Sequence, residues 1–171
     1  NGTSQFDAAV TVGVDGTGHD VKFFGDTGSR FMLWDQSDDA LLIGGAASDA
    51  IAGVTAGLQI EGTDANSSAI SIWRNTNDTG PGQITLGSSR GTGVGADTIV
   101  QNNDELGAIV FAAADGVDRV SKAASISALV GGVPGANDTP GELLFSTTAD
   151  GAQAVSERMR IMANGNVGIG T

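Results

Sequence analysis

Short runs of apolar residues recur along the chain, and most are bounded by Gly, Asp, Asn or Ser. Val10, Val12 and Val14 alternate with other residues until Asp15-Gly16 ends the run. Short apolar runs separated by turn residues at intervals of roughly ten residues are typical of β-strands. Further strands are expected at Val21–Phe24, Phe31–Trp34, Leu41–Ile43, Leu58–Ile60, Ala69–Trp73, Gln83–Leu86, Thr98–Val100, Gly107–Ala112, Ala124–Val130, Glu142–Thr147 and Arg158–Ala163. The pattern predicts an all-β fold.

The same pattern gives little support for helices. Ala46–Ala56 is the one stretch that is compatible with a helix. Gly53 lowers its helix propensity, and the β-branched residues Ile51 and Val54 lower it further. We therefore expect little or no helix.

An internal repeat with an offset of 35 residues occurs in the second half of the chain. The matching segments are Ala114-Asp115-Gly116 with Ala149-Asp150-Gly151, Val120-Ser121 with Val155-Ser156, and Ile126 and Ala128 with Ile161 and Ala163. The repeated unit consists of a strand, an Asp-Gly turn and a second strand. This predicts two stacked β units, neither of which covers its apolar face alone. A chance similarity between two hairpins is the alternative.

The last segment carries a strong hairpin signal. Asn164-Gly165 separates two apolar runs, and Asn-Gly favours a two-residue type I′ turn, which needs positive φ at both central residues. The strand partners in that register are Ala163 with Asn166, Ile161 with Gly168, and Met159 with Gly170. Met162, Val167 and Ile169 would then lie on the opposite face. Because such a hairpin is apolar on both faces, we expect it to pack against a neighbouring chain.

The composition also indicates an oligomer. Of 171 residues 27 are Gly, aromatic residues make up 5%, and Tyr is absent. A fully buried Leu, Ile, Val or Phe supplies roughly 1.5–3 kcal/mol, whereas ordering the backbone costs roughly 1–2 kcal/mol per residue. A chain with so few bulky side chains is easier to stabilise when several copies share one core.

Charge excludes several classes of partner. The net charge of −12 disfavours nucleic-acid binding, and no Lys/Arg cluster attracts an anionic membrane. No apolar stretch approaches the roughly 20 residues that span a bilayer, so membrane insertion is not expected. Many Asp residues adjoin Gly or Asn, as in Asp15-Gly16 and Asn77-Asp78. We interpret most of this charge as turn chemistry.

The sequence offers no convincing catalytic or metal site. His19 is the only His, and it lies in a polar turn. With one His and no Cys, a zinc site is not expected, and no segment has the spacing of an EF-hand calcium loop. Lys22 and Lys122 are not in phosphate-loop contexts. We expect no catalytic residues, no metal and no cofactor.

Glycan chemistry needs separate consideration. Hydrolysis would need two carboxylates about 5–10 Å apart, and the sequence cannot nominate such a pair among 20 acidic residues. Glycan binding without cleavage would favour exposed aromatic rings. Trp34 and Trp73 are the two Trp residues, and because both lie in apolar runs we interpret them as core residues.

Several segments resemble bacteriophage tail fibres and tailspikes. Glu157–Ile161 (ERMRI) followed by Gly165–Thr171 (GNVGIGT) is similar to the stretch that precedes a C-terminal intramolecular chaperone of the endosialidase type. The other similar segments are Val12–Asp15, Asp20–Gly25, Met32–Asp35, Pro134–Gly141 and Leu144–Gly151. Residues 46–87 resemble nothing specific.

The resemblance implies a homotrimeric, elongated and intertwined β-fibre, of the β-prism or β-helix kind. Family members trimerise with help from the downstream chaperone, which then cleaves itself off. The sequence ends where that chaperone would begin, so we expect a mature cleaved fibre or a truncated one, and no chaperone residues are carried over. The expected divisions are 1–45, an N-terminal strand-turn fibre segment; 46–90, a middle β segment; and 91–171, a β-repeat segment.

The expected function is that of a non-enzymatic virion structural protein, made in the bacterial cytoplasm, that presents a receptor-binding surface. Its expected partners are two further copies, other tail proteins and a host cell-surface glycan or protein. Loops 76–82 and 131–140 are candidates for receptor contact, although no individual receptor-binding residue can be assigned. The trimer-core candidates are Val12, Phe23, Leu33, Ile109, Phe111, Ile126, Phe145, Met159, Ile161, Val167 and Ile169. A polysaccharide-degrading tailspike domain and another virion decoration protein are the alternatives.

Overall fold

The computed structural model describes residues 2, 5–28 and 30–170. Thr171, the last residue of the segment that resembles the stretch before a chaperone, lies outside the described residues. The strands are β1 (Val21–Phe24), β2 (Phe31–Asp35), β3 (Ala40–Ile43), β4 (Ala50–Ile51), β5 (Val54–Thr55), β6 (Leu58–Ile60), β7 (Glu105–Ala113), β8 (Ser121–Val130), β9 (Gly141–Thr148), β10 (Val155–Ile161) and β11 (Val167–Ile169). None of the described residues is helical, so the predicted all-β class is confirmed.

The helix-compatible stretch 46–56 instead contains the two-stranded sheet of β4 and β5. Ala52 and Gly53 connect these strands with φ angles of 52° and 82°. Positive φ at both central residues is the signature of a type I′ turn. This stretch therefore forms a β-hairpin, with the β-branched residues Ile51, Val54 and Thr55 in its strands.

The chain divides into two compact units, Asn1–Ala50 with Val54–Ser71, and Ile51–Gly53 with Ile72–Thr171. The expected three-part division at residues 45/46 and 90/91 stays a prediction about domain organisation.

The N-terminal unit contains a four-stranded sheet in the order β1-β2-β3-β6. β1, β2 and β3 are antiparallel, and β6 adds in parallel to β3. Leu33, Ala40 and Leu42 form its buried cluster, against which Phe31 packs. This small core covers one face of the sheet.

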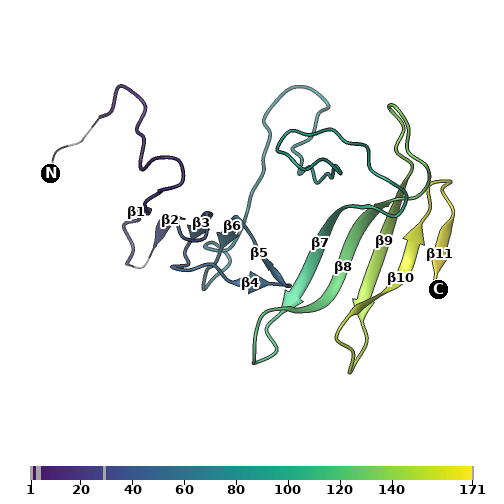
Figure 1. The fold of residues 1–171 in the computed structure, drawn as a ribbon. Coiled ribbons are helices and arrows are strands. Elements are labelled where there is room, and N and C mark those ends of the chain that lie inside the picture. The colour runs from purple at the N-terminus through teal and green to yellow at the C-terminus, as the bar shows by residue number, and fades with distance from the viewer. Residues whose placement is uncertain (1, 3–4, 29, 171) are drawn as a thin grey trace. The chain divides into compact units, whose positions relative to one another are not determined.

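The C-terminal unit contains a five-stranded antiparallel sheet in the order β11-β10-β9-β8-β7 (Figure 1). The two repeats found in the sequence are the hairpins β7–β8 and β9–β10. The repeat predicts stacked units, but β8 pairs with β9, so the hairpins lie side by side in one sheet. Edge-to-edge pairing extends the apolar face and leaves it uncovered.

The C-terminal hairpin has a different register from the predicted one. Met159 pairs with Ile169, Arg160 with Gly168 and Ile161 with Val167. Gly165 N donates to Met162 O at 2.8 Å and Met162 N donates to Asn166 O at 2.9 Å. Gly165 alone has positive φ here, at 84°, as in a type I turn followed by a G1 bulge. The turn has three residues, so the predicted facing of Ile161 and Met159 with glycines is wrong.

Four predicted strands are absent from the described residues: Val10–Val14, Ala69–Trp73, Gln83–Leu86 and Thr98–Val100. Val14 makes only an isolated bridge with Thr17. A strand requires a partner as well as an alternating pattern, and these segments have no ladder partner among residues 2, 5–28 and 30–170.

Candidate functional site

The most extensive feature of the C-terminal unit is the apolar face of its five-stranded sheet. Residues directly opposite one another across strands share a face. One row crosses all five strands and comprises Ile109, Ile126, Phe145, Met159 and Ile169. The next row comprises Gly107, Ala128, Leu143, Ile161 and Val167. These two rows, with Phe111 and Ala124 beside them, are called the C-terminal apolar face.

Much of this face is open to solvent within the single chain. Ile109 and Ile169 are 55% and 78% exposed, and Phe111 and Val167 are also exposed. Leu86 covers part of the face beside Gly107, where an added Cβ would lie 2.5 Å from the Leu86 Cβ. A contiguous exposed apolar surface of this kind marks an interaction site.

The opposite face of the same sheet carries an internally paired polar cluster. Arg160 Nε donates to Glu157 Oε1 at 3.0 Å and Nη2 donates to Oε2 at 2.6 Å, while Nη1 donates to Glu142. The Arg160 hydrogen bonds lower the pKa of Glu157, and the two carboxylates raise the pKa of Arg160. This ion-pair cluster satisfies its own charges and lies on the face opposite the C-terminal apolar face.

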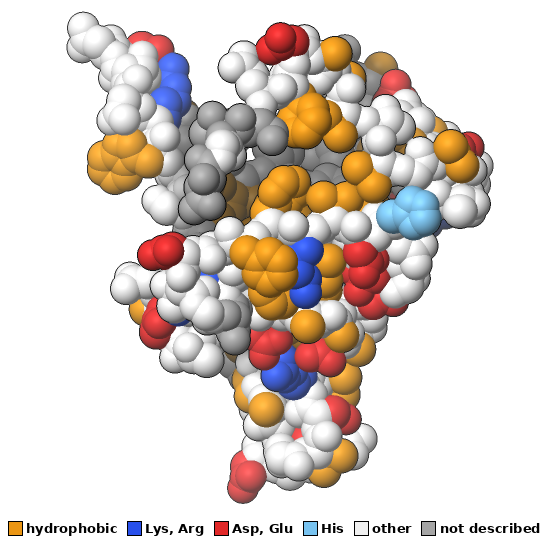
Figure 2. All heavy atoms as spheres, turned by 90° about the vertical axis from the view of Figure 1, so that its left-hand side faces the viewer, with side chains coloured by type: hydrophobic (Ala, Val, Ile, Leu, Met, Phe, Trp, Pro, Cys, Tyr) orange, Lys and Arg blue, Asp and Glu red, His pale blue; other side chains and the backbone are white. Residues whose placement is uncertain are grey.

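The N-terminal unit has an apolar face of its own. Strand registers place on it Val21, Phe23, Met32, Trp34, Leu41, Ile43, Leu58 and Ile60, which together are called the N-terminal apolar face. Phe23 is 59% exposed, and Met32, Trp34, Ile43 and Leu58 are exposed as well. Figure 2 shows groups of hydrophobic side chains at the surface of the molecule, with single charged side chains among them.

The structure brings most of the sequence-selected trimer-core residues together. Those on the C-terminal apolar face are Ile109, Phe111, Ile126, Phe145, Met159, Ile161, Val167 and Ile169. Phe23 lies on the N-terminal apolar face. Val12 lies outside the strands and is exposed. Leu33 is 4% exposed within its own chain, so it has little surface left for contact with another copy.

Sequence reasoning missed much of the N-terminal apolar face, including Met32, Ile43 and Leu58. β2 and β3 are apolar at nearly every position, so alternation cannot distinguish their two faces. The parallel pairing of β3 with β6 also has no local signal. Only the register shows that these residues share one surface with Phe23.

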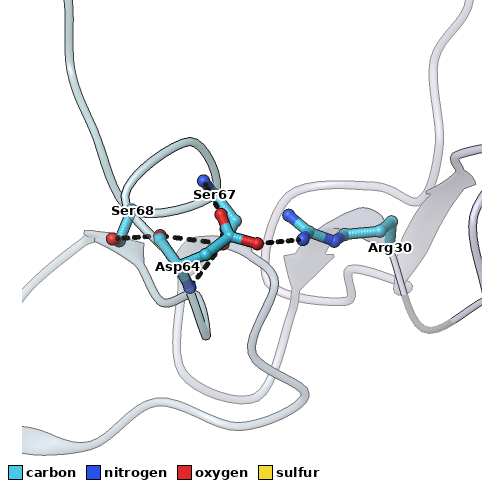
Figure 3. A network of polar contacts seen from close by, with 4 residues as sticks. All are labelled: Arg30, Asp64, Ser67 and Ser68. Carbon is cyan, nitrogen blue, oxygen red and sulfur yellow. Dashed lines mark hydrogen bonds and ion pairs between the residues drawn. The ribbon is translucent and has the colours of Figure 1, made fainter.

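A polar network fixes the segment that follows β6 in the same unit (Figure 3). Arg30 Nη2 donates to Asp64 Oδ2 at 3.2 Å, Ser67 N and Oγ each donate to Asp64 Oδ1 at 2.9 Å, and Ser68 Oγ donates to Asp64 O at 2.8 Å. The Ser67 hydrogen bonds, together with Arg30, lower the pKa of the Asp64 carboxyl. Asp64 is thus a structural anion that ties this segment to the start of β2.

A second polar network builds the loop Trp73–Gly80, which we call the Trp73 loop. Arg74 Nη1 and Nη2 donate to the two Asp78 carboxylate oxygens at 2.5 and 2.7 Å. Arg74 Nη1 also donates to Gly80 O at 2.6 Å, and Gly80 N donates to Asp78 Oδ1 at 2.8 Å. These bonds lower the pKa of Asp78 to about 2. The loop overlaps 76–82, one of the two loops singled out from the sequence.

Trp73 is not a core residue within this chain, contrary to the sequence interpretation. It is 82% exposed, and its Nε1 donates to Asn75 Oδ1 at 2.7 Å. Trp34 is also exposed, on the N-terminal apolar face. Within the described residues, both indoles keep a large exposed fraction, although Trp34 lies in a paired strand.

The other loop selected from the sequence, 131–140, is closed by its backbone. Gly135 N donates to Asp138 O at 2.8 Å, and Gly131 N donates to Pro140 O at 2.8 Å. Val133 at its tip is exposed. The loop is a compact turn and carries no cluster of ionisable groups.

An open polar depression of about 700 Å³ lies at the β7–β8 turn, lined by residues that include Asp115, Asp118, Ser121, Lys122 and Gln153. Asp115 Oδ1 accepts from Val117 N at 2.9 Å and from Asp118 N at 3.0 Å, and Asp115 Oδ2 accepts from Ser121 Oγ at 2.9 Å. These bonds lower the pKa of Asp115. The carboxylate is held ionised as part of a turn.

No group of three or more His, Cys, Asp or Glu side chains is arranged to hold a metal ion in the part of the chain that the structure describes. Over those same residues, no helix has the length and apolarity needed to cross a bilayer.

Comparison with known proteins bears on the fold. No family model matches the chain, and no curated protein matches its sequence. The structure of the carboxy-terminal domain of the L-shaped tail fibre of bacteriophage T5 is similar, with a TM-score of 0.60 and 18% sequence identity over 86% of this chain. The match covers 62% of the length of that chain. This likeness shows a shared fold.

Proposed function

We propose that this chain is a segment of a bacteriophage tail fibre in which three copies cover one another's apolar faces and present a surface to the host cell. The observation that carries the proposal is the pair of exposed apolar sheet faces in a chain with a tail-fibre fold. The sequence resemblance to tail fibres and tailspikes supports it independently. The same resemblance is the basis for proposing three copies and an intramolecular chaperone that assists their assembly.

The surface area of the chain supports an obligate assembly. Its accessible surface is 12748 Å², whereas a folded monomer of this mass exposes about 7,700 Å². The difference of about 5,000 Å² per chain is surface that remains for the copies to bury. The buried apolar side chains among the described residues are Leu33, Ala40, Leu42, Val100, Val130 and Leu144, which is a small core for a chain of this length.

The extended segments without ladder partners support intertwining of the copies. Ile70, Ile72 and Ile84 lie in 69–73 and 83–86 and are exposed. Their alternation is that of half-buried strands, and no strand in the described part of the chain pairs with them. We propose that a second copy supplies the missing strands and covers these isoleucines.

A non-enzymatic role fits the ionisation of the acidic groups. A glycoside hydrolase needs a carboxylic acid whose pKa is raised so that it can donate a proton. Hydrogen bonds lower the pKa values of Asp35, Asp64, Asp78, Asp104, Asp115 and Glu157. These six carboxyls are held ionised in turns and ion pairs, which suits a structural role for each of them.

The proposed location is the virion, where the segment would connect to other tail proteins and contact a host glycan or protein. Gold-labelled antibody against the chain should decorate tail fibres in electron micrographs of the intact phage. Labelling confined to the capsid would contradict the fibre assignment. In parallel, incubation of the purified protein with host capsule should release no oligosaccharide, and sustained release would replace the structural role with a depolymerase.

A further inference from the structure

We propose that the β11 edge of the C-terminal apolar face docks into an apolar hollow at the opposite edge of the same face in a neighbouring copy, and that Ile169 fills this hollow. The inference rests on the proposed function, because it names which surfaces of the three copies meet. It is carried by a hollow between Leu86 and the sheet, and by an exposed side chain of matching chemistry at the far edge of that sheet.

The hollow lies where the C-terminal apolar face has its smallest residues. Its volume is about 150 Å³, and its lining includes Leu86, Gly107, Ile109, Ala128 and Leu143. Gly107 and Ala128 are cross-strand partners on β7 and β8, and an added Cβ at Gly107 would lie 2.5 Å from the Leu86 Cβ. Leu86 therefore forms one wall of the hollow, and the small residues Gly107 and Ala128 leave the space at its floor.

The size and apolarity of the hollow suit one aliphatic side chain. An apolar cavity of about 150 Å³ accepts a molecule of the size of benzene, so the branched end of an Ile fits. A polar or charged occupant would lose its hydration without gaining a hydrogen-bond partner.

The surface area of the chain indicates that the occupant comes from a further copy. The accessible surface of 12748 Å² exceeds that of a folded monomer of this mass by about 5,000 Å². Contacts between copies have to cover most of this excess, and the hollow lies within the C-terminal apolar face that the proposed assembly covers. A second copy of the same chain is therefore the partner to which we commit.

The side chain that matches the hollow is Ile169 on β11. It is 78% exposed, which is the largest exposed fraction among the residues of the C-terminal apolar face. β11 is an edge strand of the sheet, and among the described residues no further strand lies beyond it. Ile169 therefore projects from one edge of the apolar face, whereas the hollow lies at the other edge, on β7 and β8.

The strand order explains why the two features meet between copies and not within one chain. β11 and β7 are the two edges of the sheet, and four strand spacings of about 4.8 Å place them about 19 Å apart, which one Ile cannot span. When three identical sheets turn their apolar faces toward a common three-fold axis, each rotation brings one edge of a sheet against the opposite edge of the next. Every corner then combines the β11 edge of one copy with the β7 edge of its neighbour.

The two features also lie at the same level along the strands. Ile169 shares a cross-strand row with Ile109, and Val167 shares the next row with Gly107. Ile109 and Gly107 both line the hollow. Rotation about an axis that runs along the strands leaves this level unchanged, so the β11 edge of one copy reaches the hollow of the next without a shift along the axis.

Paired cysteines test the contact directly, because the chain contains no Cys. Ala128→Cys and Ile169→Cys in one chain place one thiol in the hollow and another on the docking edge. Treatment of the assembled double variant with a short bismaleimide should link each copy to the next, and a denaturing gel should then show a band of three-chain mass. Neither single variant should give that band, because each chain then carries only one thiol.

Ser125→Cys combined with Ile169→Cys is the matched control. Ser125 lies on β8 like Ala128, but its side chain is on the opposite face of the sheet, because its neighbour Ile126 lies on the C-terminal apolar face. This pair should give no band of three-chain mass.

An exchange of side-chain volume gives a second readout. Ala128→Leu fills the hollow, so it should lower the urea concentration at which the copies separate, as sedimentation velocity measures it. Ile169→Ala removes the side chain that would then clash. The combination of Ala128→Leu with Ile169→Ala should therefore separate at a higher urea concentration than Ala128→Leu alone.

The inference is overturned if the double variant assembles like the parent but gives only one-chain and two-chain bands, or if the Ser125 control links as efficiently. It is also overturned if Ile169→Ala brings no recovery to Ala128→Leu. Any of these results in a protein of three-chain mass rejects this contact and leaves the proposed fibre role standing. A folded parent protein of single-chain mass would instead reject the proposed function.

Discussion

At the residue scale, the fold depends on a few positions where only glycine fits. Gly44 follows β3 with φ of 89°, and a Cβ there would lie 2.0 Å from the Glu61 backbone oxygen. Gly44 N donates to Phe31 O at 3.1 Å, and Glu61 N donates to Ile43 O at 2.9 Å. Gly44 thus allows the backbone to pass closely where β6 joins β3.

We predict that Gly44→Ala destabilises the protein by at least about 2 kcal/mol, because it adds both a positive-φ penalty and a clash with backbone. Urea unfolding of the assembled protein at fixed concentration measures this. Gly57→Ala is the matched control, because an added Cβ at Gly57 meets nothing within 4 Å and φ there is not positive. Equal midpoints for the two variants would show that Gly44 is not constrained as described.

The sequence predicted the role of a side chain where its hydrogen bonds are to residues close by in the chain. The clustering of Asp in turns was expected, and Asp115 accepts the backbone amides of its own turn. Asn164-Gly165 did mark a turn. The predicted turn type was wrong, because Asn164 keeps negative φ and Gly165 alone enters the left-handed region. One extra loop residue changes the register and therefore the face on which every following side chain lies.

At the scale of elements, the sequence predicted the paired strands well and the unpaired segments poorly. β7 to β10 were recognised because turn residues separate alternating runs. Ala69–Trp73 and Gln83–Leu86 show the same alternation but form no strand in the single chain. The alternation of apolar residues indicates that a segment can form a strand. Which strand pairs with it depends on tertiary or quaternary structure.

The register also decides which substitutions test the C-terminal apolar face. Ile161 lies on that face opposite Val167 and is partly buried. We predict that Ile161→Asp weakens association of the copies by at least about 3 kcal/mol, because it places an unpaired charge in an apolar interface. Sedimentation velocity across a concentration series should show a shift toward single chains.

Asn164→Asp is the matched control for that variant. It makes the same change of charge in the turn of the same hairpin, where the side-chain oxygen accepts from Asn166 N at 2.9 Å and an Asp oxygen can do the same. Its sedimentation should equal that of the parent. If Ile161→Asp also sediments like the parent, the C-terminal apolar face is not between copies.

At the scale of the whole molecule, the two units share one property. Each has a sheet with an apolar face that the chain itself leaves largely uncovered. The sequence indicated this shortage of bulky side chains through its Gly content and low aromatic content. It could not indicate which strands are neighbours, because the β3–β6 pairing and the β8–β9 pairing are not encoded in local patterns.

Light scattering on the purified, folded protein tests the shared core most directly. Three copies covering one another's apolar faces predict a mass three times the 17.0 kDa of one chain, unchanged on dilution through the micromolar range. A cooperatively folded species with the mass of one chain, stable on dilution, would contradict it.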